Sequence, residues 1–175
     1  SLCNLLQGLD TLPMALAERL QITYQCRVTG VHSSNGGVTL HYRRADGSTG
    51  EMQADGCVLA CQIHDAVELS PELAAIAGPL LPQIPFARLI DIKLAYRAAT
   101  HSRAFACQVP TCENRDLLMY SLTHNKAPDR APPGHSLFTL YVCDESFEKM
   151  AALSDEKLFD WARAQIERLY PEVAG

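Results

Sequence analysis

The sequence has neither an excess of basic residues nor a long apolar run. Fifteen lysines and arginines stand against twenty acidic residues, which gives a formal net charge of −5. Without a dense basic cluster, such a chain is not expected to bind nucleic acid. No stretch approaches the roughly 18 apolar residues that a membrane span needs. The first residues also lack the basic region and apolar core of a signal peptide. We therefore expect a cytoplasmic protein with no membrane span.

Familiar catalytic motifs are missing as well. The chain contains no glycine-rich dinucleotide or phosphate loop, no G-x-S-x-G serine turn and no H-E-x-x-H zinc motif. Its seven cysteines are odd in number, and spacings such as Cys57-x3-Cys61 match no zinc pattern. We predict no metal site, and we interpret Cys57 and Cys61 as free thiols buried in an apolar strand.

A few isolated residues could carry chemistry. Cys61 and His64 could be a nucleophile and its base in a hydrolase, but no third orienting group is evident. We interpret His64 and Asp65 instead as a turn histidine beside a helix-capping aspartate. His32 and His41 fall on the two arms of a predicted hairpin, where a surface pair is the simpler interpretation.

Secondary-structure signals follow one another regularly along the chain. A helix is expected at residues 11–20, capped by Asp10 or Thr11 and carrying a leucine stripe. Later helices are expected to begin at Ser70, at 146 and, with a serine cap, at Ser154. Strands are expected at residues 27–32, 38–42, 51–53, 57–61, 89–96, 117–123 and 137–143. The fold class is therefore α+β: a β-meander, a proline-rich crossing, a second antiparallel sheet and C-terminal helices.

Asp91 and Lys93 lie on one face of the predicted strand at 89–96, which we expect to be central in its sheet. Two opposite charges spaced two residues apart are typical of a solvated or ion-paired surface. A sheet face that contacts a substrate would show the same pattern. Both interpretations stay open.

Three segments in succession resemble a known family. They are "QGLDTLPMALAERL" at 7–20, the strand and hairpin from Val28 ending in "ADGCVLACQ" at 54–62, and "IPFARLIDIKLAY" at 84–96. In this order they are similar to the central part of flavin-containing amine oxidoreductases, which include monoamine oxidases, protoporphyrinogen oxidases and carotenoid desaturases. Gln7 replaces the first glycine of the family pattern, and Gln62 replaces its usual proline.

The resemblance implies the domain organisation. Residues 1–83 would be part of an FAD-binding domain together with the crossing, and residues 84–175 would be the substrate-binding domain. The backbone at Val28 would meet the adenine of FAD, and the turn at Ala60 and Cys61 would lie along the cofactor. Leu89, Asp91, Lys93 or the strand at 117–123 would line the substrate pocket. No catalytic residue is assigned.

The resemblance therefore predicts a central, substrate-domain fragment of an FAD-dependent oxidoreductase. The parent would oxidise an amine or desaturate a C–C or C–N bond of a small molecule. The alternative is a non-catalytic binding module derived from the same fold. The fragment alone is not expected to be active or to retain FAD, because the phosphate-binding glycine motif is missing. The surface meant for the missing FAD-domain segments would be apolar, which favours self-association.

Overall fold

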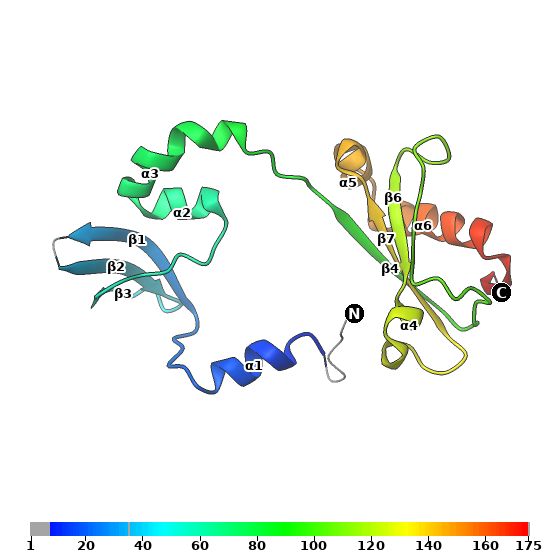
Figure 1. Ribbon diagram of the computed structural model, residues 1–175, viewed down its shortest axis with the longest axis horizontal. Helices are drawn as coiled ribbons and strands as arrows, with labels where there is room; N and C mark the ends of the chain where they lie inside the picture. The colour runs from blue at the N-terminus through cyan, green and yellow to red at the C-terminus, as the bar shows by residue number, and fades with distance from the viewer. Residues whose placement is uncertain (1–7, 35, 175) are drawn as a thin grey trace. The chain divides into compact units, whose positions relative to one another are not determined.

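The computed structural model describes residues 8–34 and 36–174. The chain divides into two compact units, one formed by Asp10–Phe86 and the other built on Ala87–Gly175 (Figure 1). Gln7 of the family-like segment and Asn35 of the predicted hairpin turn lie outside the described residues.

The first unit contains an antiparallel meander and a pair of short helices. Strands β1 (Cys26–Ser34), β2 (Gly37–Arg44) and β3 (Thr49–Ala54) pair in chain order, which confirms the predicted meander. Gly37 is required at the first turn, because a side chain there would come within 2.5 Å of the carbonyl oxygen of Ala54. Helices α2 (Ile63–Leu69) and α3 (Pro71–Ala77) lie beside β1 (Figure 1), and η1 (Gly78–Gln83) follows them.

Helix α1 (Thr11–Ala17) is found where the sequence predicts a helix. Asp10 occupies the N-cap position, but its side chain makes no capping hydrogen bond. The predicted leucine stripe has no partner in this unit: Leu12, Leu16 and Leu20 are 57%, 55% and 65% exposed, and α1 buries none of its residues.

The predicted buried strand at 57–61 is wrong. The segment adopts no strand, and Cys57 and Cys61 are exposed thiols, with Val58 between them 88% exposed. A strand is stable only when its backbone groups pair with a neighbour. None of the described strands pairs with this segment, so its apolar side chains face solvent instead of a sheet.

The interpretation of His64 and Asp65 also needs correction. Both residues lie in the first turn of α2, whose N-cap is Gln62 rather than the aspartate. The His64 ring packs edge-on against Phe86, with 4.7 Å between ring centroids. The serine cap predicted for the next helix is confirmed, because Ser70 Oγ accepts a hydrogen bond from the Leu73 amide at 3.3 Å.

The second unit is a four-stranded antiparallel sheet with helices. Its strands are β4 (Ile90–Tyr96), β5 (Ala106–Gln108), β6 (Leu117–Leu122) and β7 (Ser136–Val142), in the spatial order β4-β7-β6-β5. Strand β4 thus lies at an edge of the sheet and not at its centre as predicted. The longer connections contain α4 (Thr123–Lys126), η2 (Pro128–Arg130) and η3 (Asp144–Ser146).

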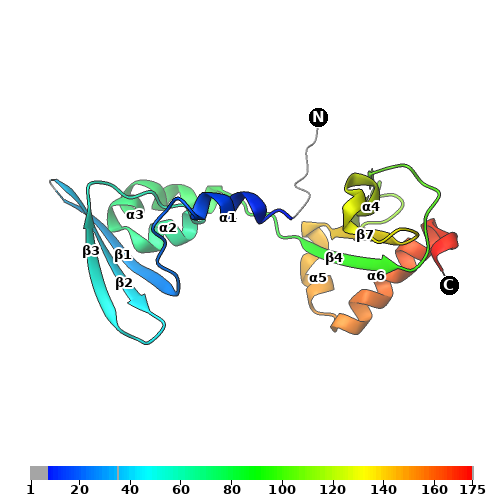
Figure 2. The same cartoon turned by 90° about the horizontal axis from the view of Figure 1, so that it is seen from below.

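Helices α5 (Phe147–Ala151) and α6 (Asp155–Leu169) cover one face of this sheet, and α4 lies on the other side (Figure 2). The chain ends in η4 (Pro171–Val173). The helix predicted to begin at 146 is divided into η3 and α5. The predicted cap of α6 is confirmed, since Ser154 Oγ accepts from the Lys157 amide at 3.5 Å.

The core lies between the sheet and α6. Its fully buried members include Leu122, Phe138, Leu140, Ala162 and Ile166. Within this core the hydroxyls of Tyr120 and Tyr170 lie 3.2 Å apart. Burial, followed by the neighbouring Cys107 and Tyr170, raises the pKa of Tyr120 far above its ordinary value. The unit is therefore an antiparallel sheet with one helix-covered face, as the α+β prediction requires.

Candidate functional site

The face of the four-stranded sheet opposite α6 is the first candidate site. Along β4, Ile92 is buried in the core, while Asp91 and Lys93 alternate with it and are exposed. Lys93 Nζ donates to Asp91 Oδ2 at 2.8 Å, so these residues form an ion pair on this face. The structure brings the two predicted substrate residues together as a surface pair at the sheet edge.

A cluster of hydroxyl groups continues from Lys93 across the sheet. Lys93 lies opposite Thr139 of β7, which in turn lies opposite Ser121 of β6. Thr123 Oγ1 lies 3.1 Å from Thr139 Oγ1 and 3.5 Å from Ser121 Oγ. The cluster exposes a cation and a carboxylate to a ligand, whereas its Ser121 and Thr139 hydroxyls are buried and both contact Thr123. It contains no nucleophile activated by a base, so it can bind and orient but not react.

Thr139 and Ser121 were not assigned a role from the sequence. They could have been found by placing β6 and β7 beside β4, because their hydroxyl residues alternate with core residues in the same phase as Lys93. No local motif indicates that β4 pairs with β7, because the paired residues Tyr96 and Ser136 are 40 residues apart.

His124 connects α4 to the start of β7. Its Nδ1 lies 3.1 Å from the Leu137 amide, which donates to it, and its Nε2 lies 3.2 Å from Thr100 Oγ1. The imidazole therefore accepts the hydrogen bond of the Leu137 amide in place of a strand backbone. We assign His124 a structural role.

The residues predicted to meet FAD lie in the first unit. Val28 is half-buried in β1, directly before an irregularity in the pairing between Val28 and Gly30. Among the described strands only β2 pairs with β1, so the other backbone edge of β1 at Val28 has no strand partner. Ala60 and Cys61 lie in the exposed segment that leads into α2. No catalytic side chain lies among these three residues.

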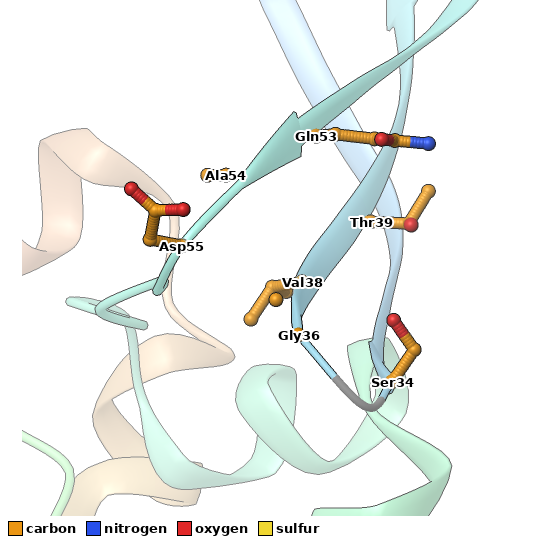
Figure 3. A pocket seen from close by; sticks show the side chains of 8 residues that line it. Ser34, Gly36, Val38, Thr39, Gln53, Ala54 and Asp55 are labelled. Atoms are coloured by element: carbon orange, nitrogen blue, oxygen red, sulfur yellow. The ribbon is translucent and has the colours of Figure 1, made fainter.

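A hollow of about 410 Å³ lies where β1 ends, β2 begins and β3 ends (Figure 3). The side chains of Ser34, Thr39 and Gln53 extend to one side of the strands, and that of Asp55 extends to the other (Figure 3). Because these polar groups do not converge on one point, the hollow carries no catalytic assignment.

Cys61 with His64, and His32 with His41, all lie within the described residues. No hydrogen bond or ring contact joins Cys61 to His64, whose ring packs on Phe86. His32 and His41 are both exposed, with ring centroids 5.5 Å apart, which confirms the surface pair. In the described residues no group of three or more His, Cys, Asp or Glu side chains is placed to hold a metal ion. Residues 8–34 and 36–174 also include no helix with the length and apolar character needed to cross a bilayer.

Comparison with known proteins agrees with the fold. A solved structure from Exiguobacterium sp. 255-15, assigned as a protoporphyrinogen oxidase, superposes with a TM-score of 0.72 at 19% identity, over 94% of this chain. The match covers only 36% of that protein, so the chain spans about a third of its length. At this identity the likeness shows a shared fold. No curated protein matches the sequence.

The family itself is shown by the sequence. The model of the family described as flavin containing amine oxidoreductase matches residues 1–175, the whole of the chain. The chain therefore belongs to the flavin-containing amine oxidoreductases.

Proposed function

We propose that the chain is the central part of an FAD-dependent oxidoreductase and carries most of its substrate-binding domain. The observation that carries this proposal is the family match over all 175 residues. A relative of shared fold that is about three times as long supports the same conclusion. In this proposal, residues 1–83 belong to the FAD-binding domain and residues 84–175 to the substrate-binding domain of a cytoplasmic enzyme.

The backbone positions of the first unit fit peripheral contacts to FAD. The unpaired edge of β1 at Val28 can present amide and carbonyl groups to an adenine ring. The exposed backbone at Ala60 and Cys61 is similarly available. The sequence contains no glycine-rich loop that could hold the pyrophosphate. We therefore propose that these residues contact FAD only together with other segments of the parent, and that the 175 residues alone do not retain it.

The residues of the second unit would bind and orient the substrate. When bound, FAD accepts a hydride from an amine or from the carbon skeleton that is desaturated. Lys93 and Asp91, the exposed charged pair of this face, would hold polar groups of the substrate by hydrogen bonds and charge. The side chains of this face supply no redox chemistry themselves, so their contribution is positioning.

The first test is the visible absorption spectrum of the full-length gene product. We expect a two-band flavin spectrum that bleaches when a candidate amine is added without oxygen. A colourless protein that takes up no added FAD would support the alternative, a binding module of the same ancestry.

The second test addresses the sheet face in the coloured, full-length enzyme. K93Q is expected to raise KM about tenfold, because one charge-assisted contact to the substrate is lost. K157Q removes an exposed lysine of α6 and is the matched control. An unchanged KM in K93Q would remove Lys93 from the proposed substrate site while leaving the flavin assignment intact.

A further inference from the structure

A second cavity lies where β4 and β6 begin and β7 ends. Its volume is about 500 Å³, which is within the range of small-molecule pockets. Leu89, Val109, Leu117 and Leu118 give it an apolar lining. Leu89 and Leu118 are each half exposed, so the apolar surface is accessible from solvent.

A polar hollow of about 450 Å³ adjoins this cavity. The two hollows share Thr111, Arg115 and Glu145 in their linings. The apolar cavity is thus continuous with the polar hollow, and these three residues line both. We call the two together the Arg115 pocket.

The arginines that line the pocket differ in how they are engaged. The Arg88 guanidinium is ion-paired with Asp144 and Glu148 and also lies 4.6 Å from the Phe147 ring centroid. The Arg115 guanidinium, by contrast, makes no hydrogen bond or ion pair within residues 8–34 and 36–174. Its five N–H donors are therefore available to a ligand.

The backbone that carries Arg115 is firmly held. Asn114 Oδ1 accepts from the amides of Asp116 at 2.9 Å and Leu117 at 3.2 Å. The Cys143 thiol donates to the Arg115 carbonyl at 2.9 Å, and the Cys143 amide donates to the Asp116 carbonyl at 3.1 Å. The main chain at Arg115 is thus held in place, while its exposed guanidinium can turn toward a ligand.

We propose that the Arg115 pocket binds a small amphipathic carboxylate. The Arg115 guanidinium would receive the carboxylate, for which its planar fork of donors is suited, with the Thr111 hydroxyl beside it. The apolar chain of the ligand would lie against Leu117 and Leu118. The inference depends only on the second unit and does not require the proposed flavin chemistry.

Glu145 also lines both hollows, and its negative charge would repel a bound anion. Binding of a carboxylate thus requires the attraction of Arg115 to exceed this repulsion. Removing the negative charge should strengthen binding, and removing the positive charge should weaken it. A ligand held only by the apolar lining would respond to neither change.

The experiment is a titration of the 175-residue protein with octanoate, followed by amide chemical shifts in NMR spectra. We expect shifts to concentrate at residues 87–89, 109–118 and 143–145. R115Q should weaken octanoate binding about tenfold, the loss typical of one charged hydrogen-bonding group. E145Q should strengthen it, and L118S should weaken both octanoate and the neutral probe octanol.

R168Q is the matched control, because Arg168 is an exposed arginine of α6 outside the pocket. Wild-type spectral dispersion in each variant establishes that it is folded. Equal octanoate affinity in R115Q and wild type would overturn the proposal, as would octylammonium binding as tightly as octanoate. Shifts confined to the exposed apolar residues of 10–86 would also overturn it.

Discussion

At the scale of single residues, Asp116 is the carboxylate most strongly engaged by its neighbours in the second unit. Lys149 Nζ donates to its Oδ2 at 2.6 Å, and Ser146 Oγ donates to its Oδ1 at 2.7 Å. The Lys149 hydrogen bond, followed by that of Ser146, holds the pKa of Asp116 below its ordinary value of 3.8. Because the pKa is lower in the folded state, ionised Asp116 stabilises the fold above pH 3.8, and this stabilisation is lost as pH falls through the folded pKa.

D116N should therefore lower the free energy of unfolding at pH 7 by about 1 kcal/mol, since a partly exposed pair is screened. It should also remove the loss of stability that protonation of Asp116 causes below pH 3.8. Urea unfolding followed by the fluorescence of Trp161, the one tryptophan of the chain, measures both effects. E113Q, which removes an exposed carboxylate of the same unit, should retain the wild-type pH profile. A D116N profile parallel to the wild type would contradict the assignment.

At the scale of elements, β6 and β7 contribute equally to the buried core cluster, and Phe138 of β7 is the largest fully buried side chain of the described residues. Phe138 is fully buried, and its ring lies 5.8 Å from Tyr96, 5.2 Å from Tyr170 and 5.9 Å from His124. F138A should cost about 3–5 kcal/mol of unfolding free energy, because it leaves a cavity at a site packed on several sides.

The matched variant is F159A on α6, where the phenylalanine is 48% exposed and the expected cost is within about 1 kcal/mol. Both variants can be compared by urea unfolding at pH 7. Similar costs for the two would show that exposure does not separate these phenylalanines in solution.

Elements were predictable where the sequence repeats a period and marks its ends. The alternation in β4, β6 and β7 and the serine caps of α3 and α6 are such signals, and the structure has these elements at the predicted places. Strand β5 escaped prediction, because three residues are too few to show a period. The strand predicted at 57–61 is wrong for a different reason. Its apolar composition indicates a buried strand, but no described strand pairs with it.

The candidate sites were less predictable than the elements. Asp91 and Lys93 stood out through their shared phase, but the position of β4 at the sheet edge depends on the order of four strands. The Arg115 pocket is assembled from the start of β4, the β5–β6 connection and the end of β7. These segments are distant in the sequence but meet in space. The Arg88 amide, for example, donates a hydrogen bond to Asp144, which lies 56 residues further along the chain. Long-range pairing of this kind leaves no local motif.

At the scale of the whole molecule, the two units differ in how completely they bury apolar surface. The buried core cluster consists entirely of residues between Ile92 and Val173. In the described part of the first unit, the buried hydrophobic residues are Val31 and Ala66. Most exposed large apolar side chains belong to this unit, and three of them are the stripe of α1 and its C-terminal flank, Leu12, Leu16 and Leu20.

Exposed apolar surface of this extent favours association. We expect the 175-residue protein to sediment as a concentration-dependent mixture of monomer and larger species. The triple variant L12S/L16S/L20S should shift this mixture toward monomer and reduce the fluorescence of a bound anilinonaphthalene dye. The second unit should remain unaffected, so the urea midpoint reported by Trp161 should stay at the wild-type value.

The matched control is A15S, a further apolar-to-serine change in α1 at an exposed position with little apolar area to remove. If the triple variant associates as strongly as the wild type, the leucines do not form the contact surface. If the protein is monomeric at all concentrations, the exposed leucines do not drive association, and the proposed apolar contact with other FAD-domain segments loses its main physical support.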